Sequence, residues 1–102
     1  MIFARVVGNV VCTRKDEKLV GRKLLLVQPV DLENQPKGNP IVTVDAVGAG
    51  EGEMVLVVQG SSARQTTATE GNPVDAAIFA IVDYVERDRQ IVFNKGKEAR
   101  AR

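Results

Sequence analysis

The segment "VGAGEGEMVLVVQGSSAR", residues 47–64, decides between two very different kinds of protein. Three glycines alternate with small or acidic residues, an apolar run follows, and two serines and an arginine close the segment. A glycine-rich loop of this kind either binds a phosphate group or supplies the backbone geometry that joins two strands of a small barrel. The neighbouring residues distinguish these two interpretations.

The glycines do not fit either common phosphate-binding pattern. A P-loop has the pattern G-x-x-x-x-G-K-[ST] and leads into a helix, whereas this segment has no such lysine and leads into a strand-like run. The dinucleotide fingerprint is G-x-G-x-x-G before a helix, but the spacing here is G-x-G-x-G. Gly48, Gly50 and Gly52 therefore predict a tight link between two strands, with positive φ angles or close backbone approach.

Ser61 and Ser62 are the next residues to test for catalysis. An esterase nucleophile lies in G-x-S-x-G and needs a histidine partner, but "GSSAR" lacks the second glycine and the chain has no histidine. No S-x-x-K spacing supplies a lysine in its place. The missing histidine also removes the commonest general base and the commonest zinc ligand. These observations argue against an enzyme, and we expect no cofactor and no metal.

Asp75 and Asp83 could form a pair of carboxylates. Asp75 lies in "PVDAA", residues 73–77, where proline followed by alanines predicts one or two helical turns, and its charge favours a helix start. Asp83 stands within an apolar run. The sequence leaves open whether Asp83 lies on a solvated face or pairs with an arginine across an interface.

The composition predicts one small β-domain. The chain has 102 residues, of which 44% are hydrophobic, but it contains no Trp, one Tyr and three Phe, so its core is aliphatic and rich in valine. Fourteen basic and 13 acidic residues give a net charge of +1, so neither nucleic acid nor a membrane surface is an expected partner. The single cysteine, Cys12, predicts a small buried hydrophobe rather than a disulfide or a nucleophile.

Alternation of apolar and polar residues predicts strands along most of the chain. Gly8 interrupts the first strand and predicts a bend or a close backbone approach there. No apolar run approaches the length of a membrane span, and the N-terminus resembles a strand rather than a signal peptide, so we expect a cytoplasmic protein. The predicted strands are residues 2–13, 21–30, 41–48, 53–59, 78–88 and 89–94.

Short strands joined by turns, with one short helix before the last pair, predict an all-β fold. The expected architecture is a small OB-like Greek-key β-barrel with one short helix. Residues 1–94 form the expected single domain, and residues 95–102, "KGKEARAR", form a basic tail that is either solvated or packs on a neighbour.

Several segments together resemble the EutN/CcmL family, the pentameric vertex proteins of bacterial microcompartment shells. These segments are "ARVVGNVVCT", "GRKLLLVQ", "DAVGAGEGEMVLVVQGSSAR" and "PVDAAIFAIVD", and they cover nearly the whole chain. The resemblance implies an OB-like barrel assembled as a cyclic ring of five copies, which closes the vertices of a carboxysome or, as "GSSAR" favours, of a catabolic metabolosome.

The resemblance also implies partners, a location and roles for particular residues. The partners are other copies of the chain, hexameric shell proteins and enclosed enzymes, in a shell within the cytoplasm. Arg64 offers a planar donor group to the adjacent subunit, and the two serines either line the axial opening or bond their own loop. The residues expected at the subunit interface or the axial pore are Gly48, Gly50, Gly60, Ser61, Ser62, Arg64 and Asp83.

Two alternatives compete with a shell protein. An OB domain that binds single-stranded nucleic acid stacks bases on exposed aromatics along a basic groove, and this chain has few aromatics and a net charge near zero. An enzyme or metal carrier could use only carboxylates, lysine or serine.

Overall fold

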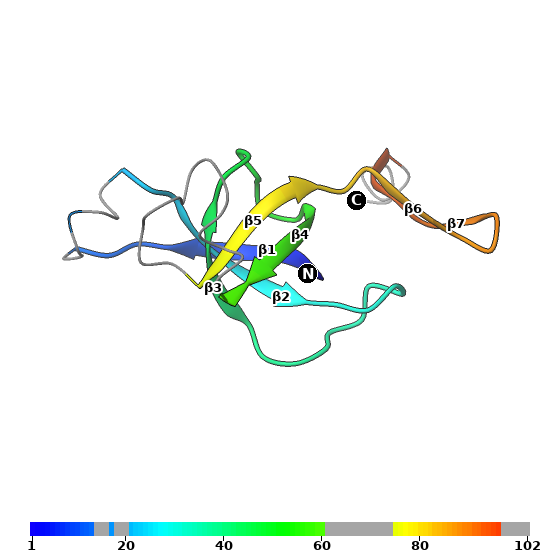
Figure 1. Ribbon diagram of the computed structural model, residues 1–102, viewed down its shortest axis with the longest axis horizontal. Helices are drawn as coiled ribbons and strands as arrows, with labels where there is room; N and C mark the ends of the chain where they lie inside the picture. Colours follow the sequence, from blue (N-terminus) through cyan, green and yellow to red (C-terminus); the bar gives the residue numbers. More distant parts are fainter. Residues whose placement is uncertain (14–16, 18–20, 61–74, 97–102) are drawn as a thin grey trace.

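The computed structural model describes residues 1–13, 17, 21–60 and 75–96 and shows a β-barrel with a hairpin projecting from it (Figure 1). The predicted all-β, OB-like fold is confirmed. Seven strands form in these ranges: β1 (Ile2–Val10), β2 (Leu24–Pro29), β3 (Ile41–Asp45), β4 (Met54–Gln59), β5 (Ala76–Ile81), β6 (Tyr84–Arg87) and β7 (Gln90–Asn94).

Five strands close the barrel in the order β1-β2-β3-β5-β4. Neighbouring strands are antiparallel except β3 and β5, which pair in parallel through Val44 with Ala77 and Asp45 with Ile78. This order, in which the last barrel strand enters between β3 and β4, is the five-stranded Greek-key arrangement of OB folds. Strands β6 and β7 form a separate two-stranded sheet.

The long strand β1 bends to pair on both sides. It pairs with β2 along most of its length and with β4 over its first half. The register shifts between Val6 and Gly8, so Val7 is the additional residue of a β-bulge and its side chain is exposed. The bend predicted at Gly8 is therefore confirmed, since a bulge increases the local twist that barrel closure needs.

The inside of the barrel is aliphatic, as the composition predicts. Alternate residues of each strand point inward, and Thr43 satisfies its buried hydroxyl by donating to the Leu25 carbonyl oxygen at 3.2 Å. The buried core cluster consists of Ala4, Val6, Leu25, Val27, Ala49, Val55, Val57, Ala76 and Ile78.

A second apolar cluster lies outside the barrel wall. Its residues on β1 and β4 alternate with the inward-facing ones, so they point away from the barrel and toward the hairpin. Phe93 of β7 and Val85 of β6 pack against them and anchor the base of the hairpin. The cluster consists of Val30, Met54, Val82 and Phe93, with Phe3, Leu56 and Val85 at its edge.

The prediction of a short helix at residues 73–77 is wrong for Ala76 and Ala77, which lie in a strand. Ala76 and Ala77 begin β5, where they pair with Gln59 and Val58. Pairing and complete burial outweigh the helix propensity of alanine. Asp75 precedes a strand and so does not charge a helix start, Pro73 lies outside the described residues, and helical conformation appears instead at Lys95 and Gly96.

The structure also differs from other predicted strand ends and from the predicted burial of Cys12, and the predicted strand 21–30 covers only Leu24–Pro29. The run 78–88 is not one strand: β5 ends at Ile81, Asp83 lies in a connection, and the chain turns out of the barrel into the hairpin. The third strand ends at Asp45 rather than at residue 48, because the Asp45 side chain begins a turn. Cys12 is half-buried rather than buried, because it lies beyond the end of β1.

Candidate functional site: the glycine link

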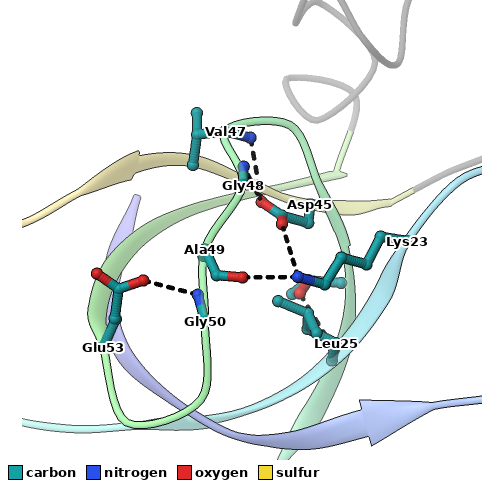
Figure 2. A network of polar contacts seen from close by, with 9 residues as sticks. Lys23, Leu25, Asp45, Val47, Gly48, Ala49, Gly50 and Glu53 are labelled. Carbon is teal, nitrogen blue, oxygen red and sulfur yellow. Dashed lines mark hydrogen bonds and ion pairs between the residues drawn. The ribbon is translucent and has the colours of Figure 1, made fainter.

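The link between β3 and β4, residues 46–53, is held by two carboxylates of the chain itself (Figure 2). The Asp45 carboxylate accepts hydrogen bonds from the Val47 N–H at 3.0 Å and the Gly48 N–H at 3.1 Å. Gly48 has a φ of 76°, which the turn requires and which other residues rarely adopt. This positive φ confirms the prediction for Gly48.

Ala49 closes the barrel at this link. Its side chain is 1% exposed and belongs to the core cluster. Its carbonyl oxygen accepts a hydrogen bond from Lys23 Nζ at 2.9 Å, and the same ammonium lies 3.8 Å from the buried Asp45 Oδ2. Lys23, the residue before β2, lies beside Asp45, whose N–H donates to the Lys23 carbonyl oxygen at 2.9 Å, and its side chain binds the link from the neighbouring strand (Figure 2).

Glu53 holds the second half of the link. Its Oε1 accepts a hydrogen bond from the Gly50 N–H at 2.7 Å, and its Oε2 lies 2.6 Å from Lys95 Nζ. These bonds, that from Lys95 above all, hold the pKa of Glu53 below its ordinary value of 4.5, and the bond with Glu53 raises the pKa of Lys95 above 10.5. Both groups are therefore charged at neutral pH.

Close packing explains Gly50, and a positive φ explains Gly52. A β-carbon on Gly50 would lie 3.3 Å from Glu53 Oε1, which confirms the predicted close approach. Gly52 has a φ of 88°, and its N–H donates to the Val6 carbonyl oxygen at 2.8 Å. Its own carbonyl oxygen accepts from Arg5 at 2.6 Å.

Arg5 extends this network to the hairpin. Its guanidinium donates to Asn34 Oδ1 at 3.0 Å and lies 5.8 Å from the centre of the Phe93 ring, in cation–π contact. The link is thus fixed to β1, to the loop after β2 and to β7. Such a network makes it a rigid structural element.

The geometry also answers the question of phosphate binding. The N–H groups of Val47, Gly48 and Gly50, which could bind an anion, already donate to Asp45 and Glu53. A phosphate would have to displace a carboxylate that is held in turn by a lysine. The glycine link therefore connects two strands and does not bind phosphate, as its sequence context predicts.

Those predicted site residues that the structure describes lie in separate parts of the fold. Gly48 and Gly50 belong to the link before β4, whereas Gly60 follows β4, at a φ of 68°, and donates to the Asp75 carbonyl oxygen at 2.7 Å. Asp83 is exposed at the base of the hairpin, where its carbonyl oxygen accepts from the Lys95 N–H at 2.8 Å. Ser61, Ser62 and Arg64 lie outside the described residues.

Sequence reasoning missed the cations and the hairpin surface. Nothing local indicates that Lys23 and Lys95 meet the link, because these contacts join segments far apart in the chain. The run Ile91–Val92–Phe93 did carry a signal, since three consecutive apolar residues of a strand cannot all face one core.

The described residues offer neither a metal site nor a membrane-spanning helix. In the described ranges, no group of three or more His, Cys, Asp or Glu residues could hold a metal ion. The same part of the chain has no helix that is long and apolar enough to span a bilayer.

The fold and the link define a class: a small OB-like barrel whose polar network stabilises its own backbone. Residues 1–83 match the family model "Ethanolamine utilisation protein EutN/carboxysome", and the chain belongs to this family. It is 44% identical over 95 residues to the bacterial microcompartment shell vertex protein EutN of Salmonella typhimurium, covering 93% of this chain and 96% of that protein.

Two solved structures extend the comparison. CcmL of Nostoc sp. PCC 7120 superposes with a TM-score of 0.89 at 45% identity, covering 93% of this chain and 100% of that one. The pentameric microcompartment shell protein GrpN of Rhodospirillum rubrum superposes with a TM-score of 0.78 at 47% identity, covering 85% of this chain and 99% of that one. The predicted family is thus confirmed.

Proposed function

We propose that this chain is a shell vertex protein that forms homopentamers at the five-fold corners of a bacterial microcompartment in the cytoplasm. The observation that carries the proposal is its membership of the EutN/CcmL family, with near-complete coverage of relatives that are named shell vertex proteins. Within that role we assign it to a catabolic compartment on the "GSSAR" segment, since the chain is about equally similar to EutN and to carboxysome CcmL.

The physical demands of a vertex fit a rigid barrel. Hexagonal tiles alone form a flat sheet, so a closed polyhedron needs pentagonal units at its corners. A ring of five copies uses a heterologous interface, in which one surface of each subunit meets a different surface of the next. A ring keeps its angle only if its subunits keep their shape, and the bonds from Lys23, Glu53 and Arg5 to the link supply that rigidity.

The role requires no catalysis. The carboxylates of Asp45 and Glu53 are committed to backbone N–H groups and lysines, so they serve structure rather than proton transfer. The proposal therefore assigns the chain no enzyme activity, cofactor or metal. Its function is geometry and protein–protein contact.

We further propose that the sequence-predicted residues meet at the subunit boundary or the axial opening. Gly60 and Asp75 tie together the two ends of the segment that carries Ser61, Ser62 and Arg64. Replacing Arg64 with Ala should loosen the ring without unfolding the barrel, because an arginine fork binds a carbonyl or carboxylate of a neighbour. A variant that stays pentameric at nanomolar concentration would exclude this role for Arg64.

The proposed partners beyond the ring are hexameric shell proteins and enclosed enzymes. The test is co-expression of the shell tiles of one catabolic compartment with and without this chain, followed by electron microscopy of the purified particles. Closed polyhedral shells that form only when the chain is present, with the chain at their corners, are the expected result. Shells that close equally well in its absence would contradict the proposal.

Nucleic-acid binding is the less favoured function. An OB domain that binds single strands needs several exposed aromatics on one face. Phe93 is buried, Phe3 and Phe79 are half-buried, and Tyr84 is exposed, but Tyr84 lies on the hairpin and not on the barrel. The four aromatics of the chain therefore form no stacking surface on the barrel wall.

A further inference from the structure

The β6–β7 hairpin packs one apolar face on the barrel, and its outer face carries exposed apolar side chains beside the polar residues Glu86 and Asn94. Val85 and Phe93 are partners across the hairpin and face the second cluster. Tyr84 precedes Val85, so its side chain points to the other face, and Ile91 shares that face through its partner Glu86. Tyr84 is 59% exposed and Ile91 57%, with the bulge residue Val92 at 42%.

The hairpin is held in a fixed shape although it leaves the barrel. The two residues of its turn, Asp88 and Arg89, have φ angles of 53° and 64°. Two successive positive φ angles are typical of the type I′ turn, which keeps the strands of a hairpin closely paired up to the tip. Neither residue is glycine, so the turn stores strain, and strained turns persist where the surroundings favour them.

An apolar groove lies beside the base of the hairpin. It has a volume of about 600 Å³ and runs between the N-terminus and the loop that follows β2. It borders the second cluster, because Phe3 and Val30 contribute to both. Its apolar lining consists of Met1, Ile2, Phe3, Pro29, Val30, Leu32 and Ile41.

Hairpin and groove are at the same end of the barrel but point in different directions. Figure 1 shows the hairpin extending to one side, beyond the N-terminus, while the loop after β2 runs below. A cyclic ring requires two different surfaces of this kind on every subunit, placed so that a rotation brings one onto the other. Both surfaces carry exposed apolar side chains among polar ones, so their contact would remove those apolar side chains from water.

Charges at the two surfaces are compatible with this contact. The hairpin tip carries Arg87 and Arg89 beside Asp88, and the groove rim carries Asp31 and Lys37. Both signs are present on each side, so polar rims can pair around an apolar centre, as in other protein interfaces.

We propose that the outer face of the β6–β7 hairpin of one subunit docks into the groove of the next copy in the ring. The occupant of the groove is thus Tyr84 and Ile91 of a second copy. This inference rests on the proposed pentamer, whose heterologous contacts require two unlike surfaces. It adds which surfaces meet and makes the hairpin the arm that fixes subunit to subunit.

Cysteine cross-linking tests the docking directly. In a Cys12→Ser background, Ile91→Cys and Leu32→Cys are combined in one chain, treated with a short bismaleimide and run on a denaturing gel. Native mass spectrometry of the same sample before treatment records whether the ring is present. We expect a ladder of covalent species up to five chains, because each residue 91 meets the Leu32 position of a neighbour.

Matched controls make the result specific. Each single cysteine variant should give no ladder, since position 91 does not meet position 91 in a heterologous ring. The pair Ile91→Cys with Val11→Cys should also give none: Val11 is 91% exposed, but it lies beyond the opposite end of the nine-residue strand β1.

The outcomes separate the two proposals. A pentamer without the ladder, or with an equal ladder from the Val11 pair, would overturn the docking and leave the proposed function standing. A chain that never forms a pentamer would overturn both.

A second variant measures the strength of the contact. Ile91→Ser should raise the subunit concentration at half dissociation of the ring by about tenfold or more, because an isoleucine loses its apolar contact. Val11→Ser should leave this concentration unchanged, and equal effects of the two variants would overturn the docking.

Discussion

Apolar side chains are buried in the barrel but partly exposed on the hairpin. Inside the barrel, Val27, Val55 and Ile78 are completely buried by the chain's own strands. On the hairpin, Tyr84 and Ile91 are more than half exposed, although they lie in regular strands. An isolated two-stranded hairpin is marginally stable in water, whereas a closed five-stranded barrel has no unpaired edge. The barrel therefore buries its own apolar residues, whereas the hairpin leaves some exposed, and in the proposed ring the next subunit covers them.

Removing a buried methyl-rich side chain from the barrel should have the largest effect. Ile78→Ala leaves a cavity at a site with no exposure, so we expect a loss of about 3–4 kcal/mol in the free energy of unfolding. Denaturant unfolding measures it, with Ile78→Val as the control at about 1 kcal/mol. If Ile91→Ala cost the dissociated subunit as much, the contrast between barrel and hairpin would fail.

The hairpin anchor should come next. Phe93→Ala removes the ring that packs against Phe3 and Arg5, and it should lower the free energy of local opening of the hairpin by about 3 kcal/mol. Amide exchange should accelerate across β6 and β7 while the barrel strands stay protected, because the anchor lies outside the barrel. Phe93→Leu, which keeps apolar bulk, should retain most protection. Equal loss of protection in β1 and β5 would show that the two regions unfold as one.

A smaller effect is expected in the glycine link. Gly48→Ala should cost about 1 kcal/mol, because the φ of 76° is unfavourable for alanine although space for a β-carbon is open. Gly48→Asn is the matched control, since asparagine tolerates this conformation better. Thermal unfolding compares the two variants. Alanine and asparagine variants of equal stability would exclude backbone conformation as the reason for this glycine.

The smallest effect should come from the ion pair that joins link and hairpin. The pKa of Glu53 is lowered in the folded state, so its contribution is present above pH 4.5 and is lost as the pH falls through the lowered value. We expect Glu53→Gln to be less stable than the natural chain by under about 1 kcal/mol at neutral pH. The difference should vanish in acid.

Two outcomes would contradict this account of the pair. A stability difference that grew as the pH fell below 4.5 would have the wrong sign. The raised pKa of Lys95 predicts the mirror behaviour: its contribution is present below pH 10.5 and is lost as the pH rises through the raised value. A constant difference from neutral pH into strong base would also contradict it.

The sequence predicts the barrel well because its signals are local. Aliphatic residues at alternate positions mark the inner face of a barrel strand, as Ala4 and Val6 do in β1, and the spacing of the glycines in residues 48–52 predicts the link. The helix prediction is wrong at Ala76 because its conformation is set by strand pairing with Gln59, which lies 17 positions away in the sequence. Helix propensity is a local quantity and does not include such a partner.

The rest of the site depends on contacts that no local pattern records. Lys23 reaches Ala49, and Lys95 reaches Glu53, only because the barrel brings distant segments together. Asp83 lay in an apolar run and was expected in a strand, but the chain leaves the barrel there, and the hairpin forms its own sheet. Consecutive apolar residues in β7 indicate that both faces of this strand pack against something. Only the fold shows which face the barrel already covers and which face is left for a partner.

Native mass spectrometry of the unmodified protein across a dilution series tests the central claim most directly. The account predicts a dominant species of about 55 kDa, five times the chain mass of 11.0 kDa, that persists until the ring dissociates to monomers. A stable monomer at every concentration, or a ring with a different number of subunits, would contradict a vertex protein.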